Sequence, residues 1–171
     1  MGTAKPSTSV DTKRSIDRRA IRFETSEDLR RDLCALEAAG LAGTLRTSGN
    51  WTPAQIYNHL AAFVEFATDG YPHDFKPPPA PVRLVMRFFK NKYLHRAMPA
   101  GLHIPGIRAG TIGQDDGPPG TAIARLRAAL DKLDRTAPRH PNHLFGRMTH
   151  QDWVRLNLRH CELHLSFLHP R

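Results

Sequence analysis

The strongest constraint on the fold is the last apolar stretch of the chain, residues 153–168, whose apolar residues recur at helical spacing. Two histidines, His160 and His164, stand four residues apart within it. Residues four apart share one face of a helix, so both imidazoles lie on the same stripe as Trp153 and Leu156. We expect that stripe to face a core. Because burying an unpaired imidazole costs about 1–3 kcal/mol, the pair requires hydrogen-bond partners or a metal.

Capping residues mark the starts of two helices in the first half of the chain. Thr25 precedes an acidic turn, and apolar residues then recur at helical spacing as far as Gly40, a residue typical of helix ends. Thr52 is followed by Pro53 and Gln55, which suit the first helical position and the third position of a capping box. The sequence therefore predicts two helices here, each starting directly after its threonine.

The second of these helices carries a third histidine on its apolar stripe. The apolar members of the stripe are Ile56, Leu60, Phe63, Phe66 and Ala67. His59 lies on the same face, so its imidazole should also point toward the core.

Two further helices complete the pattern. Apolar residues spaced three, four and three apart predict a helix from Thr121 that ends before Pro138. Thr149, with Asp152 at the N3 position, caps a final helix that should run to about Leu168. No stretch alternates with period two, and no Asn-Gly hairpin signal occurs. We therefore predict an all-α architecture, a four-helix bundle.

The connection between the second and third helices is rich in proline and in basic residues. Nine of the fourteen prolines lie between Gly70 and Gly120, which excludes a long regular element. Residues 75–114 hold seven Lys or Arg and no acid, so 7 − 0 = +7 of the net charge of +9 lies there. Such a segment suits a phosphate, a lipid headgroup or an anionic small molecule, or is a solvated face. Residues 82–96 are predicted to form a short amphipathic helix that covers the bundle or serves as a lid or surface anchor.

Length and composition limit the chain to one domain. A chain of 171 residues with 40% hydrophobic residues suits a single core. We expect a flexible basic tail over residues 1–18 and one helical domain over residues 19–171. The chain has no apolar leader and no transmembrane segment of about 18 apolar residues, so we predict a soluble, cytoplasmic protein. Cys34 and Cys161 fall within apolar helical patterns and are expected to be buried thiols without a disulfide.

Three imidazoles from two helices suggest a metal centre. If the second and fourth helices pack side by side, His59, His160 and His164 converge in the bundle interior. Three neutral nitrogens suit zinc, nickel, iron or cobalt and leave a coordination position open. Spacing alone is weak evidence, because a chain with ten histidines often contains such a pair by chance. Core histidines satisfied by hydrogen bonds are the alternative.

We expect five residues near the histidines to have other roles. Glu65 and Glu162 are expected to point away from the histidine face, with Glu162 facing solvent or another helix. Asn58 and Gln55 are candidates for hydrogen bonds to a ligand ring. Cys161 is expected to pack rather than to bind metal.

Two motifs resemble a known superfamily. Residues 50–61, Asn-Trp-Thr-Pro-Ala-Gln-Ile-Tyr-Asn-His-Leu-Ala, resemble the start of the second helix in the DinB-like superfamily, where a tryptophan and a capping Ser or Thr precede a histidine. Residues 143–168 are similar to an uncharacterised branch of that superfamily, a domain of unknown function in which a His-Pro-x-Phe-Gly turn leads into a helix ending His-x-x-x-His. The chain departs from this pattern at Leu144, where the branch usually has proline. This departure concerns only the geometry of the turn.

The resemblance implies an up-down-down-up four-helix bundle, often a homodimer, with a divalent metal on His59, His160 and His164. Some members are thiol S-transferases that bind a low-molecular-weight thiol, such as mycothiol or bacillithiol, at the metal. A metal lowers the pKa of a thiol and holds the thiolate beside an electrophile in an apolar crevice. We therefore expect a metal-dependent thiol S-transferase with zinc or nickel, acting on a small-molecule substrate in a crevice of the bundle. The basic 75–114 segment could bind the anionic part of the thiol.

Three other functions stay open. Water activated by the same metal would make the protein a hydrolase or an isomerase. Phe88, Phe89 and Tyr93 beside basic residues could stack on nucleic acid, but no RNA or DNA motif is present and we expect no nucleic-acid partner. A metal-free bundle could instead serve as a dimerisation or interaction module.

Overall fold

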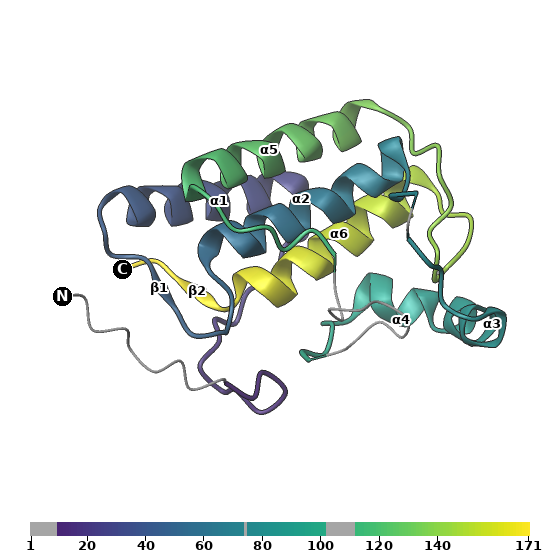
Figure 1. Cartoon of the computed structure of the whole chain (residues 1–171), viewed down its shortest axis with the longest axis horizontal. Helices are drawn as coiled ribbons and strands as arrows, with labels where there is room; N and C mark the ends of the chain where they lie inside the picture. Colours follow the sequence, from purple (N-terminus) through teal and green to yellow (C-terminus); the bar gives the residue numbers. More distant parts are fainter. Residues whose placement is uncertain (1–9, 74, 102–111) are drawn as a thin grey trace.

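Helices make up most of the part of the chain that the structure describes. The structure, a computed structural model, describes residues 10–73, 75–101 and 112–171. In these ranges the helices are accompanied by one small antiparallel sheet of two strands (Figure 1). The elements in chain order are α1 (Ser26–Leu41), β1 (Arg46–Thr47), α2 (Pro53–Asp69), α3 (Ala80–Phe88), α4 (Lys90–His95), α5 (Pro119–Arg135), α6 (His150–Leu165) and β2 (Leu168–His169).

Three of the four long helices begin where their capping threonines predict. The hydroxyl groups of Thr25, Thr52 and Thr149 each accept a hydrogen bond from the backbone N–H three residues on. The side chain of that third residue accepts in turn from the threonine N–H, which completes a capping box. α5 begins two residues before the predicted Thr121, because Pro119 occupies its first turn, where a missing N–H does no harm.

The helices α1, α2, α5 and α6 share one core (Figure 1). Representative members are Leu33 of α1, Leu60 of α2, Leu126 of α5, and Trp153 and Leu165 of α6. α2 packs against both α5 and α6, and eleven of its seventeen residues are buried. A helix that is apolar around most of its circumference lies inside a protein, so α2 is the central helix. This position buries His59, whose side chain is 2% exposed.

The chain after α6 differs from the prediction. α6 ends at Leu165, and the following β2 pairs antiparallel with β1, with Arg46 opposite His169 and Thr47 opposite Leu168. Leu168 is nevertheless fully buried, because strand pairing turns it onto the core. The all-α prediction therefore misses a two-residue sheet, which is too short to produce a visible period of two.

In the described part of the connection between α2 and α5, two helices stand where one was predicted over residues 82–96. α3 and α4 are separated at Phe89, which caps both. α4 packs on α6, where Leu94 is buried with Phe145 and Leu156. α3 contains no buried residue. The prediction of a helix that covers the bundle is thus met by α4 but not by α3.

The cysteines lie in different surroundings. Cys161 is fully buried, as predicted, and forms no disulfide. Cys34 is exposed, so the prediction of a buried thiol is wrong at this position. It follows Leu33 by one residue, and a step of about 100° around the helix turns it away from the buried stripe of α1.

Part of the predicted N-terminal tail lies against the body of the protein. The backbone N–H of Val10 donates to the Asn50 side chain at 2.7 Å, and Arg46 pairs with Asp17 at 2.6 Å. Residues 1–9 lie outside the described residues, and the boundary at residue 18 stays a prediction. None of the helices in the described ranges combines the length and the apolar character that crossing a bilayer requires.

The segment before α1 covers one face of α6. Glu162 is 6% exposed, accepts a hydrogen bond from the Phe23 backbone N–H at 2.6 Å and pairs with Arg159 at 2.9 Å. The prediction that Glu162 faces solvent or another helix is therefore wrong. An extended segment from far earlier in the sequence packs on this face, and helical periodicity carries no information about it.

Candidate metal centre

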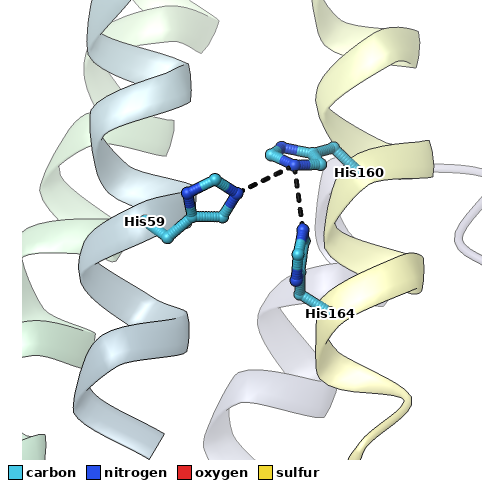
Figure 2. A group of neighbouring side chains, drawn as sticks. All are labelled: His59, His160 and His164. Atoms are coloured by element: carbon cyan, nitrogen blue, oxygen red, sulfur yellow. Dashed lines mark hydrogen bonds between the residues drawn. The ribbon is translucent and has the colours of Figure 1, made fainter. Parts of the chain in front are cut away.

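Three histidine rings meet between α2 and α6. His59 projects from α2, and His160 and His164 project from successive turns of α6 toward it (Figure 2). Nε2 of His160 lies 3.1 Å from Nε2 of His59 and 3.1 Å from Nε2 of His164. Each ring offers a nitrogen, and the three nitrogens lie within 4.8 Å of one another. The structure thus brings together all the residues predicted as ligands.

These separations suit a shared cation. Ligand nitrogens about 2.0–2.1 Å from a tetrahedral metal lie about 3.3 Å from each other. The two Nε2 distances of 3.1 Å are close to that value. The third pair of nitrogens lies within 4.8 Å, so a rotation of the His59 or His164 ring toward the other would complete the ligand set.

A backbone carbonyl determines the tautomer of His59. Nδ1 of His59 lies 2.6 Å from the carbonyl oxygen of Ile112, a distance at which the ring N–H donates a hydrogen bond. A neutral imidazole that carries its proton on Nδ1 has a lone pair on Nε2. A carbonyl behind a ligand histidine is the usual way in which proteins orient such rings and increase their basicity.

Nε2 of His160 cannot form two good hydrogen bonds within the cluster. Nε2 of His160 faces two nitrogens, yet it offers either one N–H or one lone pair. One of the two short contacts is therefore poorly satisfied by hydrogen bonding. Nδ1 of His160 is buried and has no hydrogen-bond partner among the described residues. A cation that accepts a lone pair from each Nε2 would remove this conflict.

Burial keeps the three imidazoles neutral. It lowers the pKa of His59 to about 4, against the opposing effect of the Ile112 carbonyl. Burial and the neighbouring His59 lower the pKa of His160 well below its ordinary value. The pKa of His164 is lowered in the same way by burial and by the two other rings. All three residues are thus in the form that binds metal at neutral pH.

Aromatic side chains enclose the cluster. Trp51 stacks on His164 with ring centroids 5.2 Å apart and planes 3° apart, and it meets His59 edge-on at 5.0 Å. Phe63 packs against His59 at 4.8 Å and against His160 at 4.5 Å. These contacts restrict ring rotation and make the surroundings apolar. His160 and His164 remain half-buried, so the cluster is not sealed from solvent.

The polar residues predicted to support the rings have other partners. The side chain of Asn58 donates to the carbonyl of Asp115 at 2.9 Å, and the side chain of Gln55 accepts in the capping box of α2. Neither bonds a histidine ring, so this prediction is wrong. Asn58 instead holds the segment that brings the Ile112 carbonyl to His59. The sequence could not indicate Ile112, because every residue has a backbone carbonyl and the residue type does not show which carbonyl accepts a hydrogen bond from a side chain.

The segment that carries Ile112 approaches α2 very closely. Gly113 has a φ of 73°, and a Cβ atom at this position would lie 2.6 Å from Cβ of Ala62. Only glycine combines this backbone conformation with this approach. Gly113 is the single sequence signal that could have indicated the contact.

We expect Gly113→Ala to weaken metal binding by about 10–100-fold, because the clash with Ala62 moves the carbonyl that orients His59. A competitive zinc titration against a chelator measures this change. The control is Gly43→Ala, at a glycine with a φ of 69° and no atom within 4 Å of the added Cβ. The explanation is wrong if both variants bind zinc as tightly as the wild type.

Other candidate ligands stay apart from the cluster. Both carboxylate oxygens of Glu65 accept from Arg125, at 3.0 and 2.7 Å, as expected for a residue off the histidine face. Cys161 packs in the core, where burial raises the pKa of its thiol. Within the described ranges, the three histidines alone form a group of His, Cys, Asp or Glu that could hold a metal.

Comparison with known proteins yields one match. The model of a family described as "Protein of unknown function (DUF1569)" matches residues 15–171, which include all three histidines. No curated protein and no solved structure matches the chain.

Proposed function

The chain belongs to the DUF1569 family of proteins of unknown function, and from the histidine cluster we propose that it is a metal-dependent thiol S-transferase. One observation carries the proposal. Three neutral imidazoles each place a nitrogen within 4.8 Å of the others in an apolar, half-open site, and Nε2 of His160 lies 3.1 Å from two of these nitrogens although it can form only one good hydrogen bond. Such a donor set is typical of a metal centre with an open coordination position.

We also propose that the fold is a DinB-like, up-down-down-up four-helix bundle. Three features support this relationship: the shared core of α1, α2, α5 and α6, the long connection between α2 and α5, and the placement of His59 opposite His160 and His164. The homodimer and the cytoplasmic location that we predicted belong to the same proposal.

Three imidazoles suit zinc or nickel, and also iron or cobalt. A metal bound there would lower the pKa of a thiol at the open position and supply it as a thiolate. The protein's own residues orient the ligands and make their surroundings apolar. The Ile112 carbonyl holds His59, while Trp51 and Phe63 keep the surroundings apolar.

The transfer needs no other catalytic side chain. The thiol releases its proton to solvent, its sulfur forms a bond to an electrophilic carbon, and the bond from that carbon to the leaving group breaks. The leaving group departs with the electron pair, so atoms and charges balance. Glu65 and Glu162, the carboxylates nearest the ligands in sequence, are bound to Arg125 and to Phe23 and Arg159. Neither serves as a base for water, which favours thiol transfer over hydrolysis.

Arg18 suggests that the thiol carries a negative charge. Its guanidinium lies close enough to His164 to lower the pKa of that ring. It donates to Oγ of Ser166 at 2.9 Å and to the Leu163 carbonyl at 3.3 Å. In the described part of the chain it pairs with no carboxylate. It also lies over the Phe167 ring, 4.8 Å from the ring centroid, so its described partners are all uncharged and we propose that an anionic group on the substrate supplies the counter-charge.

Thiol binding to the cobalt-loaded protein tests the proposal. Titration with 2-mercaptoethanol or mercaptoacetate should produce a sulfur-to-cobalt charge-transfer band, whereas the S-methylated compounds should not. We expect mercaptoacetate to bind more tightly than 2-mercaptoethanol, and Arg18→Gln to remove the difference. The proposal fails if the protein binds cobalt but no thiol changes its spectrum.

A further inference from the structure

One stripe of apolar side chains on α3 points into solvent. Pro81, Leu84, Val85 and Phe88 follow the spacing i, i+3, i+4, i+7 and therefore form one stripe. Leu84, Val85 and Phe88 are 57%, 53% and 82% exposed, and the adjacent Phe89 is 46% exposed. Of the seven large hydrophobic side chains exposed in the described ranges, these four are neighbours. They form a patch, which marks an interaction surface more often than scattered residues do.

α3 is joined to α4, which packs firmly on α6. α4 lies along α6, and α3 projects beyond it at the edge of the molecule (Figure 1). Leu94 of α4 is buried with Phe145 and Leu156, and Lys90 pairs with Asp152 at the start of α6 at 3.1 Å. The fold therefore holds the stripe of α3 outward.

Positive charge surrounds the patch. Residues 75–114 contain no acidic residue. Arg87, Lys92 and Arg96 are exposed, and none pairs with a carboxylate in the described part of the chain. Ala80, Pro81, Arg83, Leu84 and Arg87 line a shallow hollow on this face. The hollow thus offers guanidinium groups beside apolar side chains.

We propose that α3 binds peripherally to the surface of an anionic lipid bilayer. The stripe of Leu84, Val85 and Phe88 would enter the boundary between headgroups and acyl chains, while the exposed Arg87 contacts a lipid phosphate. An anionic bilayer offers an apolar interior to the stripe and negative charge to the basic side chains. A second copy would bring the same positive charge against it, and a nucleic acid would leave the apolar stripe in water. The inference goes beyond the proposed thiol chemistry and does not depend on it.

Flotation of the full-length protein with vesicles tests this inference. We expect binding to vesicles that contain phosphatidylglycerol and little binding to pure phosphatidylcholine. Leu84→Ser and Phe88→Ser should each weaken binding about tenfold or more, because each removes a side chain that enters the bilayer. Arg87→Gln should weaken binding and make it less sensitive to salt. The matched control is Leu41→Ser, at a leucine that is 87% exposed on α1 and should have no effect.

Three results would overturn the inference. The first is vesicle binding that Leu84→Ser and Phe88→Ser leave unchanged. The second is equal binding to neutral and anionic vesicles. The third is no vesicle binding, together with a dimer that Phe88→Ser converts to a monomer in light scattering, which would assign the patch to a second copy. Circular dichroism and metal content should match the wild type in each variant, since none of these side chains is buried in the core.

Discussion

His160→Ala is expected to abolish stoichiometric metal binding. Nε2 of His160 lies 3.1 Å from both other Nε2 atoms, so its removal leaves two ligands that share no third donor. Elemental analysis of protein purified without a histidine tag should find close to one metal per chain in the wild type and almost none in the variant. His59→Ala and His164→Ala should give the same result. Zinc at about 100 times its dissociation constant should stabilise only the wild type, by about 2.7 kcal/mol.

His95→Ala provides the matched control for these variants. His95 is exposed on α4 and takes no part in the cluster, so its replacement should leave metal content and melting temperature unchanged. A wild type that holds no metal after incubation with zinc and nickel, and whose melting temperature ignores both ions, would contradict the metal centre. The cluster would then be a set of histidines in edge-on contact without a metal, and an interaction module would be the better description of the protein.

Glu162→Ala is expected to destabilise the metal-free protein by about 3–5 kcal/mol. Glu162 and Arg159 are 6% and 3% exposed and pair at 2.9 Å, and Glu162 also accepts from the Phe23 N–H. Removing the carboxylate leaves the buried guanidinium without its counter-charge and the N–H without its acceptor. Denaturant unfolding in the presence of a chelator measures the change without any contribution from a metal.

Glu65→Ala tests whether burial is the cause of this loss. Glu65 also pairs with an arginine, Arg125 at 2.7 Å, but the two side chains are 28% and 40% exposed. A pair this open to water should contribute less than about 1 kcal/mol. Equal losses in the two variants would show that the desolvated position of Glu162 has no special effect.

Much of the secondary structure and the composition of the candidate site could be predicted from the sequence. The three capping threonines start their helices as expected, because a capping box involves only four consecutive residues. His59 lies on the apolar stripe of α2, and His160 and His164 lie one turn apart on α6. Helical periodicity over a few residues shows which residues share a face with each histidine. The packing of α2 against α6 then brings the three rings together.

The failed predictions concern contacts between residues distant in sequence. The acceptor for His59 is the Ile112 carbonyl, 53 residues away, and not the nearby Asn58 or Gln55. Glu162 is covered by a segment that lies 139 residues earlier. Neither contact has a local pattern, because a backbone carbonyl or N–H exists at almost every position.

The sequence by itself determined where the capped helices begin and which face each histidine shares, since capping and periodicity act over a few residues. Tertiary structure alone decided what covers each face. The N-terminal segment buries Glu162, residues 112–115 supply the carbonyl behind His59, and nothing in the described chain buries the apolar stripe of α3. The physical reason is that burial and hydrogen-bond partners depend on which distant segments pack together, and a periodic pattern shows only that a face is apolar.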